Sequence, residues 1–164
     1  MCKAIVDIEV TASFGTSFDN GVALAFKSTS PCLDDTAGNI TLPANGRPTL
    51  LRFTLKTVEV EWTEGSHPGK GKLGFQLKPG ADGWESFWIR PKGGNKTQRK
   101  HPQFPSCTLE ATPPGPPRVI VVEASNSEQG DFPYCLAVGI DMGNGQFLSL
   151  RQDPRIRNGG IRLD

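Results

Sequence analysis

Apolar and polar residues alternate over short stretches of this chain, and the alternation has the period of a β-strand. In the first stretch Ala4, Val6, Ile8 and Val10 fall on one face, while charged residues such as Asp7 fall on the other. A strand with this pattern has one face on a core and the other in water. The N-terminal segment is therefore predicted to be an amphipathic strand.

Similar stretches recur along the chain, separated by Gly, Pro, Asn and Asp residues that favour turns. They lie at residues 22–26, 40–42, 73–77, 84–90, 107–111, 119–124, 134–141 and 146–150. Within them, the unbroken Val-Ile-Val-Val of residues 119–122 predicts a central strand covered on both faces. Asn144-Gly145 predicts a hairpin between 134–141 and 146–150, and a hairpin with a longer loop is predicted between 73–77 and 84–90.

The longest strand-like stretch, residues 49–62, changes the parity of its apolar positions partway. These positions are odd at first and even afterwards: Leu51, Phe53 and Leu55, then Val58, Val60 and Trp62. A bulge or corner near Lys56-Thr57 explains the change, because such a break lets one strand leave a first sheet and enter a second. The stretch is thus predicted to contribute to two sheets.

The fold class that follows is an all-β, antiparallel two-sheet sandwich of immunoglobulin-like or Greek-key type, with a jelly roll as the alternative. No window of about a dozen residues has helical spacing, so no long helix is expected. The 19 Gly and 14 Pro are scattered between apolar runs as turn residues. With 164 residues the chain has the length of one domain, and residues 1–164 are taken as a single β-sandwich domain.

Charge and hydropathy narrow the range of partners. The net charge is +1, which makes nucleic acid an unlikely partner for the molecule as a whole. No run of apolar residues has the length of a membrane span, and no membrane partner is expected. The chain opens with Met1 and no leader, which predicts a cytoplasmic protein, or a secreted one if Met1 replaces a removed leader.

The cysteines are far apart in sequence, and none of their spacings resembles a zinc or redox motif. They are Cys2, Cys32, Cys107 and Cys135. Thiols that pack as small apolar groups are expected, although the even number also permits two disulfides. Asp34-Asp35 lacks the ligand spacing of a calcium loop, so neither a metal nor another cofactor is expected.

The C-terminal residues 152–158, Gln-Asp-Pro-Arg-Ile-Arg-Asn, carry a resemblance to a known family. They resemble the Asp-Pro-x-Ile-x-Asn ending of the bacterial DP-EP family of small, uncharacterised β-sandwich proteins, and residues 51–55 are loosely similar as well. The resemblance implies a fold and no activity. Pro154 lacks a backbone donor, which favours a role for Asp153-Pro154 as a clasp that ends ladder pairing.

Several motifs have the residue types of catalytic sites without their context. Residues 69–74 form a G-x-G-x-x-G, but a strand pattern follows the glycines where a phosphate site needs a helix N-terminus. His67 and His101 each precede a proline in a predicted loop, where a solvated imidazole is expected. Glu59 and Glu61 alternate with apolar residues, as on the wet face of a strand. No catalytic residue is therefore assigned.

The segment 84–90 is the candidate contact strand. If Phe87 and Ile89 point into the core, then Trp84, Trp88 and Arg90 share the opposite face. Two indoles and a guanidinium in a row suit stacking on sugar rings, on bases or on a partner's side chains. The alternative is that the tryptophans belong to the core.

A basic segment follows directly and extends the candidate surface. Its cations, with no acidic residue among them, are Arg90, Lys92, Lys96, Arg99 and Lys100. These residues and the two tryptophans make up the predicted ligand-binding set. The expected function is a non-enzymatic module that binds a carbohydrate or protein ligand or associates with itself as a homo-oligomer. The alternatives are a carbohydrate-binding or sugar-active module that uses Trp84 and Trp88, and polyanion binding by the 90–101 loop.

Overall fold

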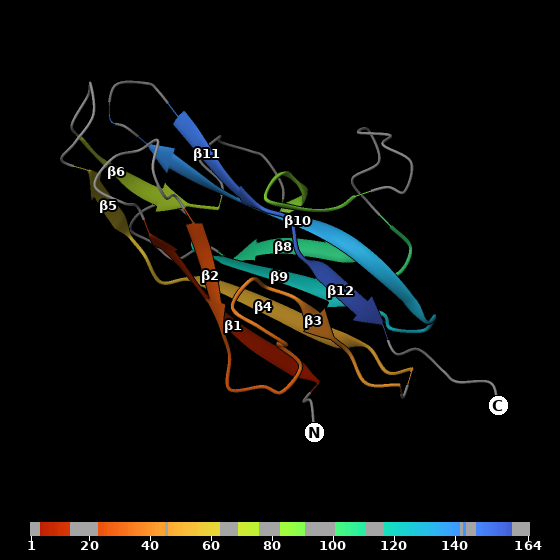
Figure 1. Cartoon of the computed structure of the whole chain (residues 1–164). Helices are drawn as coiled ribbons and strands as arrows, with labels where there is room; N and C mark the ends of the chain where they lie inside the picture. The colour runs from red at the N-terminus through yellow and green to blue at the C-terminus, as the bar shows by residue number, and fades with distance from the viewer. Residues whose placement is uncertain are drawn as a thin grey trace.

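The computed structural model of the chain describes residues 4–13, 23–44, 46–62, 69–75, 83–90, 101–110, 117–141, 143 and 147–158. These residues are almost entirely β, with twelve strands and one turn of 3-10 helix, η1 (Gly83–Glu85) (Figure 1). The all-β class is therefore confirmed. Within the described ranges no helix is long and apolar enough to cross a membrane.

The first sheet has the strand order β2-β1-β4-β9-β8. Its strands are β1 (Ile5–Ser13), β2 (Ala23–Lys27), β4 (Thr49–Leu55), β8 (Ser106–Glu110) and β9 (Val119–Ala124). The pairing of β1 with β4 is parallel, whereas the other pairs in this sheet are antiparallel. The prediction of purely antiparallel pairing is wrong here, because the long segment between β1 and β4 allows the crossover that parallel strands need.

The second sheet has the order β3-β12-β10-β6-β5, with β7 and β11 also paired to β10. Its strands are β3 (Ile40–Thr41), β5 (Glu59–Trp62), β6 (Gly69–Gly74), β7 (Phe87–Ile89), β10 (Gly130–Asp141), β11 (Phe147–Gln152) and β12 (Arg155–Asn158). The pair β3 and β12 is parallel. Both sheets are therefore mixed.

β10 is the central strand of the second sheet, and β11 and β12 together line one of its edges. The register is the same on both sides of the break between them: Pro133 pairs with Arg155, and Leu136 pairs with Gln152. The Tyr134 N–H donates to the Pro154 carbonyl at 2.9 Å, which carries the ladder across the break. Residues 147–158 thus form one antiparallel partner of β10, interrupted at Asp153-Pro154.

The corner predicted at Lys56-Thr57 is confirmed. β4 lies in the first sheet and β5 in the second, and the bend between them is tied to β1. The Lys56 N–H donates to the Val10 carbonyl at 2.8 Å, and the Ala12 N–H donates to Thr57 Oγ1 at 2.9 Å. Val58 lies in the bend and is 49% exposed, so the inward position predicted for it is wrong.

The hairpin predicted between residues 134–141 and 146–150 is confirmed by the pairing of β10 with β11. The other predicted hairpin is not formed by the described residues of β6 and β7. Both strands pair with the same edge of β10 instead, with Gly74 opposite Gly139 and Phe87 opposite Leu136. Their apolar side chains, Leu73 in β6 and Phe87 in β7, reach the core from there and are fully buried.

The two sheets share one hydrophobic core that draws on almost every strand. Aromatic rings run through it in contact: Phe53 lies 6.1 Å from Tyr134 between ring centroids, and Phe87 lies 5.3 Å from Tyr134. Each buried ring removes a large apolar area from water, which stabilises the fold by roughly 1.5–3 kcal/mol per side chain. Tyr134 of β10 therefore lies at the centre of the interface between the sheets.

The prediction of a free thiol is wrong for Cys32. Cys32 is disulfide-bonded, and its partner sulfur lies outside the described residues. Cys107 and Cys135 carry thiols and are buried, as expected for small apolar groups.

Candidate functional site

The row of two tryptophans and an arginine does not form. Trp84 lies in η1 and is only 8% exposed, with its ring 6.3 Å from Phe87, so its predicted place beside Trp88 and Arg90 is wrong. The turn holds it there because Gly83 lies so close to Cys107 that a Cβ would be 2.8 Å from the Cys107 carbonyl. Phe87 and Ile89 point into the core as predicted.

The remaining residues of the predicted ligand-binding set are not brought together by the described part of the chain. Trp88 is half-buried in β7, and Arg90 is exposed directly after it. Lys92, Lys96, Arg99 and Lys100 lie outside the described residues. A ligand-binding role for these side chains stays a prediction.

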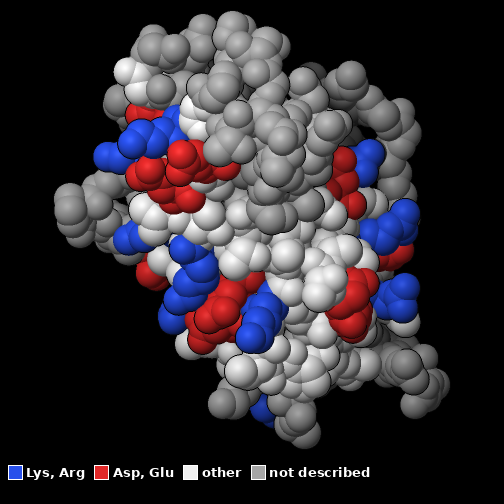
Figure 2. Space-filling model, turned by 60° about the vertical axis from the view of Figure 1, so that its left-hand side comes forward, with Lys and Arg blue, Asp and Glu red and all other residues white. Residues whose placement is uncertain are grey.

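Two of the motifs that resembled catalytic sites lie in the neighbouring strands β5 and β6. Residues 69–74 form β6 and open no helix. Glu59 and Glu61 are exposed and stand opposite Lys72 and Lys70 in the ladder of β5 and β6. Acidic and basic residues are likewise interleaved over the face drawn in Figure 2. These carboxylates belong to a wet strand face, as predicted.

His101, the histidine that the structure describes, packs against the aromatic core. Its ring lies 4.8 Å from that of Phe132, and its Nδ1 accepts a hydrogen bond from the Gln103 N–H at 3.1 Å. The imidazole is half-buried, where a solvated ring was expected. These contacts with Phe132 and Gln103 hold the segment before β8 in place.

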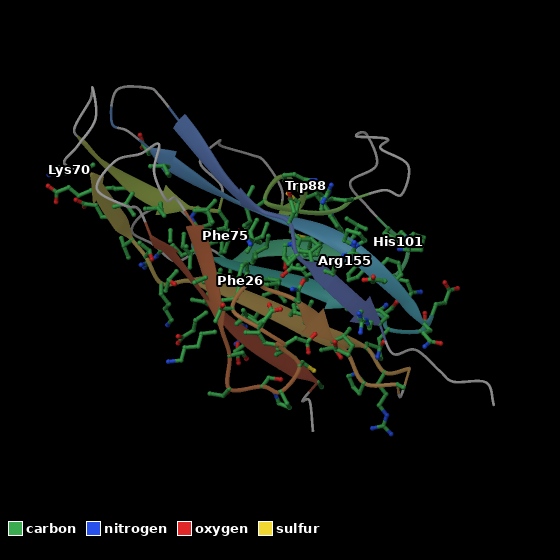
Figure 3. The ribbon with its side chains drawn as sticks, in the orientation of Figure 1. Phe26, Lys70, Phe75, Trp88, His101 and Arg155 are labelled. Atoms are coloured by element: carbon green, nitrogen blue, oxygen red, sulfur yellow. The ribbon has the colours of Figure 1, made fainter. Side chains whose placement is uncertain are left out.

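A different surface, over β3, β12 and β10, gathers polar side chains. Along β12 the residues alternate between exposed and buried: Arg155 and Arg157 face outward, whereas Ile156 and Asn158 are fully buried. Arg155 lies on the β12 edge of β10, while Trp88 lies on the strand at the opposite edge (Figure 3). β12 therefore presents two guanidinium groups at neighbouring outward positions.

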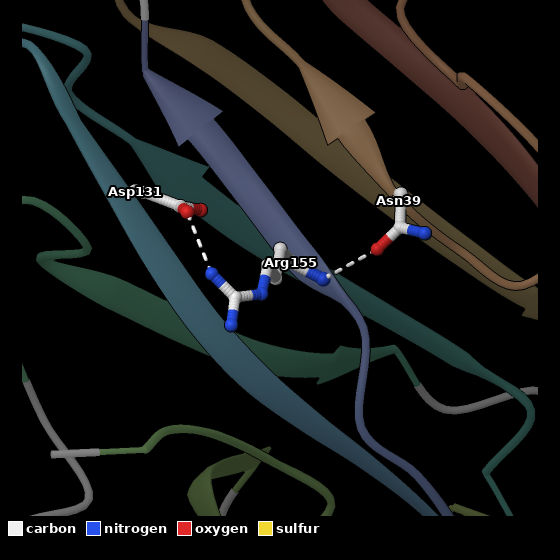
Figure 4. Close-up of polar contacts among 3 residues, drawn as sticks. All are labelled: Asn39, Asp131 and Arg155. Carbon is white, nitrogen blue, oxygen red and sulfur yellow. Dashed lines mark hydrogen bonds and ion pairs between the residues drawn. The ribbon is translucent and has the colours of Figure 1, made fainter. Parts of the chain in front are cut away.

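The register places these arginines between two other strands. Arg157 pairs with Asp131 of β10 on one side and with Thr41 of β3 on the other. The Arg155 Nη1 donates to Asp131 Oδ2 at 2.7 Å, and the Arg155 backbone N–H donates to Asn39 Oδ1 at 2.9 Å (Figure 4). Three segments distant in sequence thus meet around β12.

Two hollows lie side by side on this surface, and we call them together the β12 groove. The polar hollow, of about 370 Å³, is lined by Asp34, Asp35, Asn39, Ile40, Thr41, Asp131, Arg155 and Arg157. The second hollow, of about 550 Å³, is lined by Thr41, Leu42, Pro43, Ala44, Gln129, Gly130, Asp131, Arg157 and Asn158. Thr41, Asp131 and Arg157 line both, so the hollows adjoin along β12. Volumes of this size are typical of small-molecule sites.

The loop beside β3 forms one wall of the polar hollow, and local hydrogen bonds fix its shape. The Asn39 side-chain amide donates to Asp35 Oδ2 at 2.8 Å, while the Ala37 and Asn39 N–H groups donate to Asp35 Oδ1. These bonds, led by that of the Asn39 side chain, hold the pKa of Asp35 below its usual value. The Thr41 hydroxyl donates to Asp34 Oδ2 at 2.6 Å. Both carboxylates are therefore already engaged.

Tyr134, from the core, anchors the same loop. Its hydroxyl donates to the Gly38 carbonyl at 2.6 Å, and burial of the ring, helped by the charge of Asp35, raises the pKa of Tyr134 well above 10.0. Gly38 has φ of +96°, and a Cβ there would lie 2.9 Å from the Phe26 ring. A glycine is required at this position, so the wall rests directly on the core.

The floor at the far end of β12 is a buried polar network. Asn158 Nδ2 donates to Gln103 Oε1 at 3.2 Å, and Gln103 Oε1 also accepts the backbone N–H groups of Ser127 and Glu128. Asn126, with φ of 52°, donates from Nδ2 to the Pro43 carbonyl at 2.8 Å. These bonds join the end of β12 to the turn before β10.

Three polar groups that line the groove have no partner among the described residues, and one of them is Asn158 Oδ1, which is shielded from solvent. Asp131 Oδ1 is shielded from solvent and accepts no hydrogen bond in the described part of the chain. Arg157, its cross-strand neighbour, forms no ion pair with any described carboxylate. Because these oxygens are shielded, the group that the groove offers to a ligand is the exposed Arg157 guanidinium.

Sequence reasoning missed this site because β12 was not predicted as a strand. The signal was present, since Arg155-Ile156-Arg157-Asn158 alternates with period two. Asp34 and Asp35 were considered only as calcium ligands, and no group of three or more His, Cys, Asp or Glu in the described ranges is placed to hold a metal ion. No family model and no curated protein matches the chain.

Proposed function

We propose that the chain acts as a binding module without catalytic activity and that its ligand is held in the β12 groove. The observation that supports this most directly is the exposed Arg157, which lines both hollows and forms no ion pair with any described carboxylate. A guanidinium without an ion pair at the wall of a hollow of this size suits a ligand that accepts hydrogen bonds. The groove takes the place of the 84–90 strand as the proposed contact surface.

The fold type and the family are part of the same proposal. Two sheets around one core, with a strand that crosses between them at a corner, support an immunoglobulin-like or Greek-key sandwich, with a jelly roll as the alternative. Asp153, Pro154 and β12 together make up the Asp-Pro-x-Ile-x-Asn element on which the resemblance to the bacterial DP-EP family rests. The two buried positions of that element are Ile156, which packs in the core, and Asn158, which donates to Gln103 in the floor network.

The proposal is tested by nuclear magnetic resonance on the ¹⁵N-labelled protein. Pools of sugars, amino acids, short peptides, carboxylates and oligonucleotides are added, and the amide signals that shift are mapped. A ligand of the groove moves the signals of residues 39–44, 129–131 and 155–158. An Arg157→Gln variant loses these shifts, while Glu61→Gln, a charge change on β5, keeps them. Shifts confined to Trp88, Arg90 and the 91–101 segment would instead favour the surface predicted from sequence.

A proposal about the compartment rests on Cys32. Disulfides persist mainly in oxidising compartments, so the Cys32 bond favours the secreted alternative over the cytoplasmic one. Counting thiols by mass after alkylation tests it in protein from its native source. Two modified cysteines are expected in denaturant without reductant, and more with reductant. Modification of all four cysteines without reductant would show that the disulfide is absent and would favour a cytoplasmic protein instead.

A further inference from the structure

The two hollows of the β12 groove differ in the charged residues that line them. The polar hollow has three acidic and two basic residues in its lining, namely Asp34, Asp35, Asp131, Arg155 and Arg157. The second hollow has one of each, Asp131 and Arg157. Asp131 is already bound by Arg155 at 2.7 Å, and its Oδ1 is shielded from solvent. In the second hollow the charge left for a ligand is therefore the positive charge of Arg157.

Much of the remaining lining of the second hollow is apolar. Leu42, Pro43 and Ala44, which follow β3, lie on one side of β12, and Gly130 of β10 lies on the other. The uncharged polar residues of the lining are Thr41, Gln129 and Asn158. The side chain of Asn158 is fully buried and already hydrogen-bonded. A ligand in this hollow thus meets apolar surface beside one unpaired cation.

We propose that the second hollow binds a monocarboxylate that carries an apolar group, an inference that rests on the proposed function and names its ligand class. The carboxylate accepts two parallel N–H bonds from Arg157, because the planar fork of a guanidinium matches the two oxygens of a carboxylate. The apolar group packs against Leu42, Pro43 and Ala44, which removes apolar surface of both partners from water. Neither contact involves the shielded oxygens of Asp131 and Asn158.

The acidic residues of the neighbouring hollow limit the charge of the ligand. One negative charge is balanced by Arg157, whereas Arg155 is already paired with Asp131. A second negative charge on the ligand has no further unpaired cation in the lining and is repelled by Asp34 and Asp35. Dicarboxylates and phosphate are therefore expected to bind more weakly than a monocarboxylate with the same or a larger apolar group.

The experiment titrates the ¹⁵N-labelled full chain at pH 7 and low salt with isovalerate, hexanoate and benzoate, and with isovaleramide, hexanamide and benzamide as neutral controls of the same shape. At least one carboxylate is expected to shift the amide signals of residues 41–44, 129–131 and 157–158 to saturation. Its amide is expected to bind about tenfold or more weakly, because the ion pair and one hydrogen bond to the guanidinium are lost. Acetate, glutarate and phosphate are expected to bind more weakly than the best monocarboxylate.

Three variants locate the carboxylate in the hollow. Arg157→Gln removes the cation and is expected to weaken binding of the carboxylate by about tenfold or more, and binding of the amide by less. Ala44→Asp places a negative charge at an exposed position of the lining and is expected to weaken the carboxylate more than the amide as well. Glu61→Gln changes a charge on β5 and is expected to leave both affinities unchanged.

The other outcomes separate the two proposals. If the amides bind as tightly as the carboxylates, or if glutarate or phosphate binds more tightly, a single negative charge is not what the hollow recognises and the inference fails. If a compound of the wider pools shifts the groove signals and no carboxylate does, the inference fails and the groove remains a binding site. If neither this panel nor the wider pools move the groove signals, both the inference and the proposed function are overturned.

Discussion

The two ends of the second sheet differ in how their charged side chains are paired. At the β5–β6 end, Glu59 stands opposite Lys72 and Glu61 opposite Lys70, so each carboxylate faces a cation across the ladder. At the β3–β12–β10 end, Arg157 stands between Asp131 and Thr41, and the carboxylate of Asp131 is bound by Arg155 instead. The first end balances its charges within the fold, and the second leaves Arg157 without an ion pair among the described carboxylates.

The difference follows from which charged residues stand at paired positions on neighbouring strands. β5 and β6 carry opposite charges at matching positions, which stabilises a hairpin by tenths of a kcal/mol per pair and blunts the edge of the sheet. β12 carries two arginines at alternate positions, but the neighbouring strands supply one aspartate in register and one threonine. The matched charges at the β5–β6 end therefore support the fold, and the unmatched Arg157 in the hollow supports the proposed binding site.

The largest effect is expected for the buried face of β12. Ile156→Ala removes a fully buried side chain, so the free energy of unfolding should fall by about 2–5 kcal/mol. Urea denaturation of the variant and the wild-type chain measures the difference. A loss below about 1 kcal/mol would mean that β12 is only loosely attached and that the groove has no fixed floor.

Tyr134→Phe removes the support of the loop beside β3. The Gly38 carbonyl loses its buried partner, and the free energy of unfolding should fall by about 1–3 kcal/mol at neutral pH. The folded-state pKa of Tyr134 lies above its unfolded value of about 10.0, so its contribution is complete below pH 10 and is lost as the pH rises further.

Urea denaturation from pH 7 to pH 11 tests both statements. The difference in stability between wild type and Tyr134→Phe should stay constant up to about pH 10 and then shrink. A difference that stays constant to pH 11 would mean that the hydroxyl of Tyr134 is accessible to solvent and ionises as in the unfolded chain.

A charge reversal tests the matched end of the sheet. Glu61→Lys places two like charges opposite each other at Lys70, which should cost about 0.2–1 kcal/mol at low salt and less at high salt. The double variant with Lys70→Glu restores an opposite pair and should recover most of the loss. Equal stability of the single and double variants would show that these charges do not interact across the ladder.

The smallest effect on stability is expected at the mismatched end. Arg157→Gln changes an exposed residue without an ion pair among the described carboxylates, so the unfolding free energy should change by less than about 0.5 kcal/mol. The same variant is expected to lose ligand binding in the groove. A large loss of stability would make Arg157 a structural residue and remove the contrast between the two ends.

Much of the fold could be predicted from the sequence, because strand alternation is a local property. The corner at Lys56-Thr57 and the inward positions of Phe87 and Ile89 followed from parity alone. Trp84 was misplaced because a 3-10 turn precedes β7, and the turn depends on close packing of Gly83 against Cys107. Local alternation contains no information about that contact.

The candidate site could not be predicted from the sequence, for a related reason. Arg155 and Asn39 are hydrogen-bonded although 116 residues separate them, and Asp131 reaches the same place from a third strand. The parallel pairing of β3 with β12 joins them, and nothing in either short segment specifies its partner. The register of distant strands decides which side chains become neighbours.

By itself, therefore, the sequence determined that this protein is built of strands, which face of most strands is buried, and where one strand crosses between sheets, because these depend on residues next to each other in the chain. Only the tertiary structure decided which strands pair in parallel, that Trp84 is covered, and that Arg157 lies between Thr41 and Asp131. Those features depend on long-range packing, in which each strand competes for the edges and faces that the other strands leave open.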